Sequence, residues 1–509
     1  MDRYEALRHY FGHTSFREGQ DVIIDALLSG RDALAVMPTG AGKSMCFQIP
    51  ALIQEGVALV ISPLISLMKD QVLSLVQMGA PAAYLNSSLT LSQQQEALRR
   101  AAQGRYKIIY VAPERLNSPD FLHFALHATI SLIAVDEAHC VSQWGQDFRP
   151  SYLRIAEFIA RLPKRPPVGA FTATATPHVK DDIRELLSLQ NPKTVVTGFD
   201  RPNLHFSVRK IPTMRERDEA LLQIIREHGS DSGIVYCATR KSVEEVCDLL
   251  SDYHVSATRY HAGLSDDERR SNQDDFRFDR AQVMVATNAF GMGIDKSNVR
   301  YVVHYNMPKD LESYYQEAGR AGRDGAEAEC ILLYNGRDVH TARWLIEHSE
   351  TRYELSEDER ATLIERDLER LKQMTFYTAS RKCLRKFILN YFGEHASEHC
   401  MNCSYCAEEA RVYVPAAQPK KEKREPGLLG AIKDLRNRIA RIKGVPAYVI
   451  FSDETLRDMA ERLPTTMEEF SMVKGVGEVK LELYGPDFLS ILRVYALAQL
   501  HGQSIPDKI

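Results

Sequence analysis

Short apolar runs alternate with amphipathic stretches along the first two thirds of the chain. The first five runs are Ala33–Met37, Ala58–Ser62, Ile108–Val111, Leu132–Val135 and Gly169–Thr172. Five more follow at Gly233–Tyr236, Ala257–Tyr260, Val283–Ala286, Tyr301–His304 and Cys330–Leu333. Stretches of helical periodicity such as Leu64–Gly79 and Ser242–Tyr253 separate the runs. Strands that are apolar throughout and alternate with helices predict parallel sheets covered on both faces. The sequence therefore predicts an α/β fold with two such domains in tandem.

The domain boundaries follow from the same patterns. The two α/β domains are expected at residues 1–198 and 199–337, and a small helical, cysteine-bearing domain at 338–408. Residues 409–427 contain the segment PAAQPKKEKREPG, which is typical of an exposed linker. Helical periodicity returns in 428–503, which predicts a small all-α unit at the C-terminal end.

Composition excludes several classes of protein. With 44% apolar and 26% charged residues among 509, the chain has ample material for several cores, so it is not a disordered or fibrous protein. The first residues resemble no secretory signal, and no run approaches the roughly 18 apolar residues of a membrane span. We therefore expect a cytoplasmic protein with no membrane partner. The net charge of −4 does not indicate a polyanion ligand, but Lys420–Lys443 carries nine basic and three acidic residues.

A glycine-rich segment follows the first apolar run. It reads Pro38-Thr39-Gly40-Ala41-Gly42-Lys43-Ser44 and leads into a helical pattern. Glycines let the backbone direct its N–H groups at phosphate oxygens, and the helix N-terminus adds positive charge. We expect Thr39, Gly40 and Gly42 to cradle the phosphates of ATP, Lys43 to reach the β- and γ-phosphates, and Ser44 to bind Mg²⁺. The strict motif has glycine where this chain has Met37.

An acidic pair follows the fourth apolar run. Asp136 and Glu137 open the sequence DEAH, 93 residues after Lys43. Acidic groups at the carboxyl end of a strand meet the ligand crevice of an open α/β sheet. Asp136 is expected to hold Mg²⁺ through water, and Glu137 to orient or deprotonate the attacking water.

Four of the nine cysteines lie close together in the sequence. Cys383, Cys400, Cys403 and Cys406 have the spacing C-x₁₆-C-x₂-C-x₂-C. Two CxxC turns that share one cysteine bring thiolates to a tetrahedral ion, so this spacing predicts a structural Zn²⁺ site. An iron–sulfur cluster is the alternative. The other five cysteines are expected to be reduced packing residues.

Further motifs are distributed along the chain. They are Phe16–Gln20 (FREGQ), Pro63–Gln71 (PLISLMKDQ), Ala112–Leu116 (APERL), Asp136–Tyr152 (DEAHCVSQWGQDFRPSY), Thr172–Thr174 (TAT), His261–Leu264 (HAGL), Ala289–Ile294 (AFGMGI) and Gln316–Arg323 (QEAGRAGR). These motifs occur in the order found in superfamily 2 helicases and resemble the RecQ family of DNA helicases in particular. The resemblance covers residues 1–408 and resumes near 428. It implies two RecA-like lobes, ATP hydrolysis and unwinding of DNA in the 3′–5′ direction, with roles in recombination and repair.

The resemblance also implies roles for individual residues. Gln20 reads adenine, Arg17 and His13 lie beside the base, and His13 stands where relatives often have tyrosine. Arg320 and Arg323 sense the γ-phosphate from the second lobe, with Arg323 as the finger. In the aromatic-rich loop, Trp144, Phe148 and Arg149 couple DNA to ATP hydrolysis, unless the two rings merely seal the cleft between the lobes.

Residues 428–503 resemble the helicase-and-RNase-D C-terminal domain, abbreviated HRDC. Lys433, Arg436 and Tyr448 are its expected DNA contacts, and Gly475-Val476-Gly477 resembles a hairpin that presents N–H groups to phosphate. Many RecQ proteins have a winged-helix domain before this unit. Here only 21 residues separate Cys406 from Leu428, fewer than an independent domain needs, so we expect no winged helix.

The sequence thus predicts a monomeric ATP-dependent DNA helicase that acts on single-stranded and partly duplex DNA. Single-strand-binding protein or repair factors are its expected protein partners. The alternatives are an RNA helicase, a double-strand translocase that does not separate strands, and a zinc-bearing DNA-binding scaffold with a silent motor.

Overall fold

The computed structural model describes residues 1–63, 65–143, 148–290, 296–348, 357–411 and 427–500. The chain divides into two compact units. The first contains the N-terminal lobe, residues 1–198, together with the C-terminal helical bundle, and the second contains the next lobe and the cysteine-bearing region. None of the helices in the described part of the chain is long and apolar enough to cross a membrane.

The first lobe is built on a seven-stranded sheet with the order β3-β4-β2-β5-β6-β1-β7, in which every neighbouring pair is parallel. Its strands are β1 (Ala33–Val36), β2 (Val57–Ile61), β3 (Ala82–Leu85), β4 (Ile108–Val111), β5 (Ile130–Val135), β6 (Val168–Thr172) and β7 (Lys193–Val196). Strands β1, β2, β4 and β6 are buried along their whole length, which is why they read as unbroken apolar runs.

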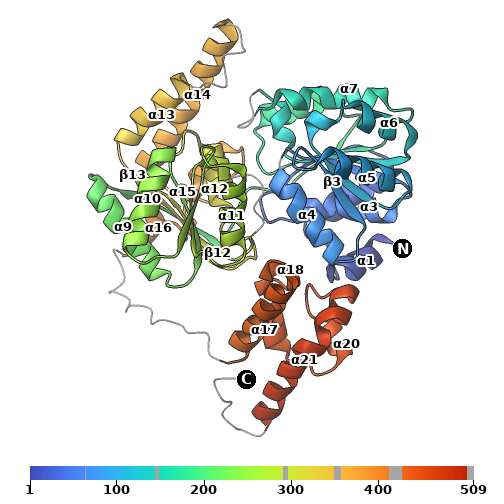
Figure 1. Ribbon diagram of the computed structural model, residues 1–509. Coiled ribbons are helices and arrows are strands. Elements are labelled where there is room, and N and C mark those ends of the chain that lie inside the picture. Colours follow the sequence, from blue (N-terminus) through green and yellow to red (C-terminus); the bar gives the residue numbers. More distant parts are fainter. Residues whose placement is uncertain (64, 144–147, 291–295, 349–356, 412–426, 501–509) are drawn as a thin grey trace. The chain divides into compact units, whose positions relative to one another are not determined.

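Helices cover this sheet, as Figure 1 shows. The main ones are α2 (Gln20–Leu28), α3 (Lys43–Ile53), α4 (Ile65–Gln77), α5 (Leu91–Ala102), α6 (Pro119–His127), α7 (Arg154–Arg161) and α8 (Pro177–Leu186). Before them, α1 (Arg3–Ala6) runs into a π-helical turn at Leu7–Phe11. The core of the lobe joins α2, α3 and α4 to the strands through residues such as Ile23, Phe47 and Leu75, all fully buried.

The second lobe has a six-stranded parallel sheet with the order β10-β11-β9-β12-β13-β8. Its strands are β8 (Leu204–Lys210), β9 (Ser232–Tyr236), β10 (Ala257–Tyr260), β11 (Val283–Ala286), β12 (Val299–His304) and β13 (Ala328–Tyr334). Helices α9 (Met214–Glu227), α10 (Arg240–Asp252), α11 (Asp266–Arg277) and α12 (Leu311–Ala318) connect them. Strand β8 stands at one end of this sheet.

The cysteine-bearing region follows in the same unit. It comprises α13 (Arg337–Glu347), α14 (Glu357–Ala379), α15 (Leu384–Tyr391) and α16 (Ser404–Arg411). It continues onto the sheet itself, because Cys403 forms an isolated parallel bridge with Phe206 of β8. Ser404 Oγ accepts a hydrogen bond from the Val208 backbone at 3.4 Å.

The C-terminal bundle consists of α17 (Leu428–Lys443), α18 (Ala447–Ile450), α19 (Asp453–Arg462), α20 (Met467–Ser471) and α21 (Glu478–Leu500). Phe451, Phe470 and Phe488 meet in its core with ring centroids 5.0 to 6.4 Å apart. These helices are drawn in red in Figure 1.

The fold class is as the sequence predicts: two parallel-sheet lobes, a helical region with four cysteines, and an all-α bundle. Each of the ten predicted strands overlaps an observed strand, and Met37 and Ser62 lie one residue beyond the ends of β1 and β2. Three strands were not predicted: β3, β7 and β8. The burial of β3 and β7 is incomplete, so their sequences lack the unbroken apolar run used to find the others.

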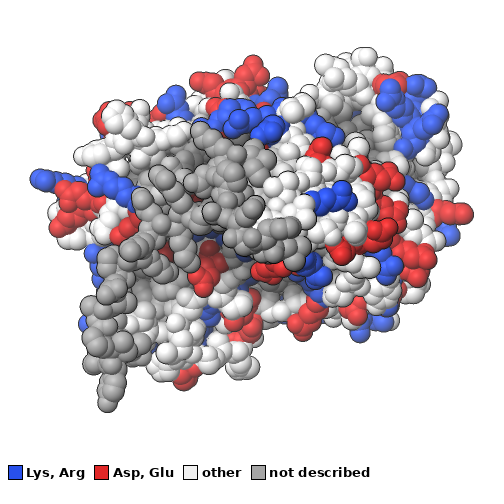
Figure 2. Space-filling view, turned by 90° about the horizontal axis from the view of Figure 1, so that it is seen from below, with Lys and Arg blue, Asp and Glu red and all other residues white. Residues whose placement is uncertain are grey.

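Charged side chains are mixed on the molecular surface. Figure 2 shows basic and acidic groups interspersed over the face in view, in keeping with the net charge of −4. Affinity for a polyanion therefore has to come from local sites rather than from the overall field.

Candidate functional site

The glycine-rich loop lies between β1 and α3, as its sequence predicts. Gly40 and Gly42 have φ values of 84° and 82°, in the left-handed region that glycine tolerates. Gly42 also caps α3 at its N-terminus, and a Cβ there would lie 2.5 Å from Gln20 Nε2. Both the backbone conformation and the close approach of α2 therefore require glycine at position 42.

Lys43 is the first residue of α3 and turns back over the loop. Its Nζ donates hydrogen bonds to the carbonyl oxygens of Met37 at 2.8 Å and Pro38 at 3.3 Å. The ammonium group is thus held over the concave side of the loop. Ser44 follows in the first turn, and both Ser44 and Thr39 are half-buried.

Asp136 and Glu137 lie where β5 ends. The Asp136 N–H donates to the carbonyl of Ile61 on neighbouring β2 at 2.8 Å, which continues the sheet to the acidic pair. Burial raises the pKa of the Asp136 carboxyl to about 7, with the neighbouring Glu137 charge adding to the shift and Lys43 opposing it. Strands β5 and β1 lie in the same parallel sheet with β6 between them, so the acidic pair and the phosphate loop both lie at its carboxyl edge.

Glu137 has an unusual environment. Its φ of 46° is left-handed, which is uncommon for a residue with a side chain. Its Oε2 is buried and has no hydrogen-bond partner among the described residues, while His139 Nδ1 lies 3.4 Å away. A buried carboxylate oxygen that lacks a partner is suited to hold a water molecule or a cation's hydration shell.

His139 connects this pair to the neighbouring strand. Its Nδ1 is 2.8 Å from the hydroxyl of Thr172, the last residue of β6. That hydroxyl also donates to the carbonyl of Thr174 at 3.0 Å. Sequence reasoning assigned no role to His139 or Thr172. The sequence does contain a signal for this contact, because His139 belongs to the DEAH motif and Thr172 to the TAT motif, and these motifs lie at the ends of the adjacent strands β5 and β6.

The residues expected beside adenine lie next to the phosphate loop. Gln20 is buried, and its Nε2 donates to the carbonyls of Ala41 and Gly42, both at 3.1 Å, while its Oε1 accepts from the Arg17 N–H at 2.8 Å. Arg17 donates to the Gly40 carbonyl. His13 is half-buried, and burial and the Arg17 charge lower its pKa, so the ring is neutral near pH 7. Gln20 thus also braces the phosphate loop, a contact the sequence did not predict.

The structure places the aromatic-rich loop only in part. Trp144 lies outside the described residues. Phe148 and Arg149 are half-buried, and Arg149 donates to the carbonyl of Pro63 at 3.2 Å. Tyr152, at the end of the same motif, is fully buried and donates to the Asp136 carbonyl at 2.9 Å. The segment after DEAH is therefore bonded directly to the acidic pair.

Arg320 and Arg323 follow α12 in the second lobe. Arg320 is buried and Arg323 is half-buried. Gly322, between them, has a φ of 55°, and a Cβ there would lie 2.5 Å from Asn203 Nδ2. We call residues 319–326, which carry both arginines, the arginine loop.

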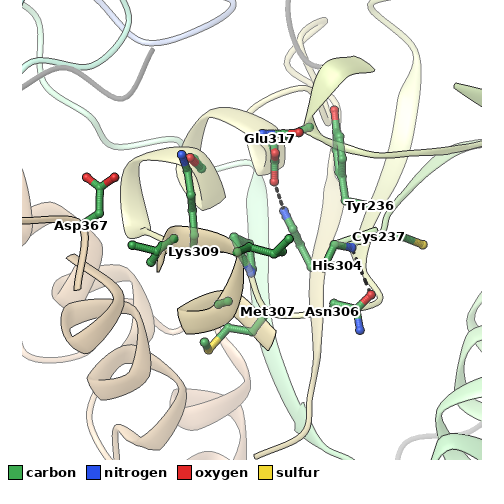
Figure 3. Close-up of a pocket in the computed structure, with 15 residues that line it drawn as sticks. Tyr236, Cys237, His304, Asn306, Met307, Lys309, Glu317 and Asp367 are labelled. Carbon is green, nitrogen blue, oxygen red and sulfur yellow. Dashed lines mark hydrogen bonds and ion pairs between the residues drawn. The ribbon is translucent and has the colours of Figure 1, made fainter. Parts of the chain in front are cut away.

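A cavity of about 280 Å³ opens at the carboxyl edge of the second sheet. Figure 3 shows its polar residues: His304 at the end of β12, Asn306 and Lys309 just beyond it, and Tyr236 at the end of β9. His304 Nε2 pairs with Glu317 of α12 at 2.9 Å. Lys309 is the one lysine among the residues that line the cavity, where Glu317 and Asp367 are acidic. The start of α12 is capped by the Asp310 carboxylate, which accepts from the Ser313 N–H at 2.6 Å. The sequence analysis did not predict a site at these residues. The available signal was a group of polar residues directly after a buried strand.

The four predicted cysteine ligands come together. The sulfur atoms of Cys383, Cys400, Cys403 and Cys406 all lie within 4.8 Å of one another, and three of these residues are buried. Backbone N–H groups of Lys386 and Asn402 point at the sulfurs of Cys383 and Cys400 at 3.5 and 3.4 Å, which favours thiolates. Four sulfurs at this separation match a tetrahedral metal site.

The three residues of the HRDC bundle that were expected to contact DNA differ in how far they are buried. Lys433 and Tyr448 are half-buried. Arg436 is buried in the bundle, where it donates to the Phe451 carbonyl at 3.0 Å and pairs with Asp453. Arg436 therefore stabilises the bundle and has no surface to offer DNA, contrary to the expectation. Arg385, two residues after Cys383, is also buried and donates to the Arg201 carbonyl.

The hairpin glycines of the bundle contact the first lobe. The Gly475 N–H donates to the carbonyl of Gly12 at 3.0 Å, and a Cβ on Gly12 would lie 2.3 Å from the Val476 carbonyl carbon. His9 pairs with Glu478 at 2.7 Å, and the Tyr484 hydroxyl bonds to Gln77 of α4 at 3.3 Å. The hairpin thus lies beside Gly12, one residue before His13.

Comparison with family models identifies four consecutive domains. Residues 17–183 match the DEAD/DEAH box helicase family, and 216–325 match the helicase conserved C-terminal domain. Residues 336–407 match the RecQ zinc-binding family, and 425–492 match the HRDC domain. These matches and the two lobes define an ATP-dependent helicase of the DEAD/DEAH type.

Similar proteins specify the family. A protein of Bacillus subtilis (strain 168) described as ATP-dependent DNA helicase RecQ is 39% identical, with 96% of this chain and 98% of that protein covered. One of the same description from Pasteurella multocida (strain Pm70) is 35% identical over 96% of this chain and 93% of its own length. The chain belongs to the RecQ family and is an ATP-dependent DNA helicase.

The length of these alignments shows that a relative carries sequence that this chain lacks. The alignment with the Bacillus subtilis protein spans 591 positions, more than the 509 residues of this chain, so that relative carries sequence without a counterpart here. In this chain the zinc-binding match ends at 407 and the HRDC match begins at 425. The interval between the two matches is shorter than an independent domain needs, and the absence of a winged helix from it stays a prediction.

Solved structures show the same fold. S. cerevisiae Dbp5 bound to RNA and ADP BeF3 superposes with a TM-score of 0.54 at 18% identity, covering 72% of this chain and 97% of that one. The DUF1998 helicase MrfA bound to DNA gives a TM-score of 0.56 at 18% identity, covering 83% of this chain and 63% of that one. Since one binds RNA and the other DNA, the fold alone does not specify the nucleic acid.

Proposed function

We propose that this helicase hydrolyses ATP at the phosphate loop and acidic pair, moves 3′ to 5′ along single-stranded DNA, and unwinds partly duplex DNA in recombination and repair. The observation that carries the proposal is the convergence of Lys43, Asp136 and Glu137. Lys43 lies over the phosphate loop after β1, and the acidic pair follows β5 at the same carboxyl edge of the sheet.

The chemistry follows from where these groups lie. Lys43 exchanges its bonds to the Met37 and Pro38 carbonyls for phosphate oxygens, and the loop N–H groups bind the remaining charge. Ser44 and Asp136 would hold Mg²⁺, which neutralises charge on the phosphates. Glu137, with its buried oxygen, orients the attacking water, and His139 Nδ1 lies 3.4 Å from that oxygen.

Arg320 and Arg323 are proposed to stabilise the charge that develops on the γ-phosphate, with Arg323 as the finger. Because such a group acts mainly on the transition state, its removal lowers kcat far more than it changes ATP binding. His13, Arg17 and Gln20 are proposed to contact adenine, with Gln20 releasing the carbonyls of Ala41 and Gly42 as it does so.

The four cysteines are proposed to hold one Zn²⁺. Sulfur ligands alone, mutual separations within 4.8 Å and N–H groups directed at two of the sulfurs fit this ion. A site closed by four thiolates leaves no position for a substrate, so its role is structural.

The DNA strand is proposed to follow the carboxyl edges of the sheets. In the second lobe, the cavity of Figure 3 offers Lys309 and Asn306 to a backbone phosphate. In the first lobe, Trp144, Phe148 and Arg149 are proposed to report strand binding to the acidic pair. The bonds from Arg149 and Tyr152 in the same motif support this assignment.

A strand-displacement assay tests the proposal. The full-length protein is given ATP and partly duplex DNA with a 3′ or a 5′ overhang, and in parallel the matching RNA duplexes. We expect ATP-dependent displacement of DNA with the 3′ overhang only. Displacement of RNA alone would favour an RNA helicase. DNA-stimulated hydrolysis without displacement would favour a double-strand translocase, and absence of hydrolysis a scaffold.

A further inference from the structure

The arginine loop is held by a short segment that precedes the second sheet. We propose that Arg201 and Asn203, in the segment 199–204, are positioning residues that fix Arg320 and Arg323 for their action on the γ-phosphate. The segment is called the strap below. The inference rests on the proposed role of the two arginines and extends it to residues that touch no substrate.

The strap binds the backbone of the arginine loop at four carbonyl oxygens. Arg201 donates to Gly319 at 3.4 Å, Ala321 at 3.0 Å and Gly322 at 2.8 Å. Asn203 Nδ2 donates to Gly322 at 2.9 Å and Ala326 at 2.8 Å. The two side chains are themselves joined, since Arg201 Nε donates to Asn203 Oδ1 at 3.3 Å.

The position and composition of the arginine loop explain why it needs these bonds. The loop follows directly on α12, which ends at Ala318, and the strap binds carbonyls of the loop itself rather than those of the helix. A cation at that end also interacts favourably with the helix dipole. The loop contains three glycines, Gly319, Gly322 and Gly325, so it would be pliable without external support. Arg201 and Asn203 supply that support on both sides of Arg320 and just before Arg323.

The contact is also sterically specific. A Cβ on Gly322 would lie 2.5 Å from Asn203 Nδ2 and 2.6 Å from the Ala326 carbonyl oxygen. The loop therefore closes around the Asn203 amide. The backbone of Asn203 accepts a further bond from the Ala328 N–H at 3.1 Å, which fixes the strap relative to β13.

On its other side, the strap is held by the cysteine-bearing region. Arg385, two residues after Cys383, donates to the carbonyls of Arg201 and Leu204 and pairs with Asp200. Asn402, between Cys400 and Cys403, donates to the Pro202 carbonyl at 2.9 Å. The strap thus links the cysteine-bearing region to the arginine loop, and the position of the arginines depends on both.

Asn203→Ala and Asn203→Asp test the inference. Asparagine and aspartate have the same shape, but aspartate has no N–H to donate to Gly322 and Ala326. For each variant, kcat and KM for ATP are measured at saturating single-stranded DNA. We expect kcat to fall about tenfold for both while KM for ATP stays within about twofold, because displaced catalytic groups weaken the transition state more than the ground state.

The matched control is Asn335→Ala. Asn335 also donates its amide to two backbone carbonyls in the same unit, Ile211 at 2.7 Å and Pro212 at 3.0 Å, but these do not belong to the arginine loop. We expect a native kcat for this variant. Thermal unfolding followed by circular dichroism establishes that all variants are folded.

A double-mutant cycle separates positioning from a general structural effect. Asn203→Ala is combined with Arg320→Ala and Arg323→Ala, and we expect no further loss of kcat in that background. An equal loss in both backgrounds, or native kcat for Asn203→Ala, would overturn the inference while leaving the arginines' role intact. Native kcat for the Arg320→Ala, Arg323→Ala variant would instead remove the proposed role of the arginines, and the positioning role with it.

Discussion

The backbone N–H of Gly475 donates to the carbonyl oxygen of Gly12 at 3.0 Å. This bond joins a hairpin of the HRDC bundle to the residue before His13, which is proposed to lie beside adenine. The N–H that the hairpin would offer to a DNA phosphate is therefore committed within the chain in this structure. Docking of the bundle on the first lobe and phosphate binding by this hairpin N–H exclude one another.

Gly12→Ala should release the bundle from the first lobe. A Cβ at this position meets the Val476 backbone at 2.3 Å, which no rotamer can relieve. Hydrogen–deuterium exchange should become faster at residues 473–480, and binding of single-stranded DNA should strengthen. Gly30→Ala is the matched control, because Gly30 also has a left-handed φ, 78°, but a Cβ there meets nothing within 4 Å. Both variants have the same backbone strain of about 1–2 kcal/mol. Equal exchange in the two would show that the contact is not maintained in solution.

Lys43→Ala should abolish ATP hydrolysis and leave single-strand binding within a few-fold of the native value. The ammonium lies over the phosphate loop and neutralises phosphate charge there. Lys107→Ala is a suitable control, since Lys107 also donates to a backbone carbonyl of the same lobe, that of Gln54 at 2.7 Å. Steady-state hydrolysis and fluorescence anisotropy with a labelled oligonucleotide measure the two properties. A parallel loss of both activities would contradict the assignment.

Binding of Mg²⁺–nucleotide should depend on pH through Asp136. Burial raises the pKa of this carboxyl to about 7, so the protein without ligand holds a proton there at pH 6, and a cation must displace it. Affinity for Mg²⁺–ADP should therefore rise between pH 6 and pH 8, with about one proton released per binding event at the lower pH. Calorimetry in buffers of different ionisation enthalpy measures that proton.

The raised pKa of Asp136 also makes the stability of the folded protein depend on pH. A carboxyl whose pKa is raised in the folded state contributes stability below its unfolded value near 4, and that contribution disappears as the pH rises through about 7. Asp136→Asn should remove both pH dependences. If proton release is unchanged in this variant, another group binds the proton.

Removal of zinc should lower the stability of the second unit. Native protein is expected to contain one zinc per chain by atomic absorption, Cys403→Ala none, and Cys247→Ala, outside the cluster, one. Chelation should lower the midpoint of thermal unfolding, because metal binding contributes directly to folding free energy. Iron with visible absorbance would identify the site as an iron–sulfur cluster, and zinc retained in Cys403→Ala would contradict the ligand set.

Much of the fold is predictable from local sequence because buried parallel strands read as unbroken apolar runs. β7 was not predicted, because its sequence KTVV is only partly buried and contains no unbroken apolar run. β8 mixes apolar residues with His205, Arg209 and Lys210 and likewise has no clean run.

The functional residues also fall into two groups: those that a local motif predicts, and those whose role depends on contacts with residues distant in the sequence. Lys43, Asp136 and the four cysteines lie in short motifs whose spacing carries the chemistry. Arg201 and Asn203 lie more than a hundred residues before the loop they hold, and Arg436 is basic in sequence yet buried against Asp453. Only the folded chain decides which polar groups bind one another and which remain for a ligand.

The bridge between Cys403 and Phe206 has a further consequence. β8 is the last strand of its sheet, and its outer side would otherwise present unpaired N–H and C=O groups, a template on which a second chain can add a strand. The cysteine-bearing region covers part of that side through Cys403, Ser404 and Asn402. If the four cysteines hold zinc as proposed, the ion also stabilises the segment that covers this edge. We then expect zinc removal to expose the outer side of β8 and to favour aggregation through added strands.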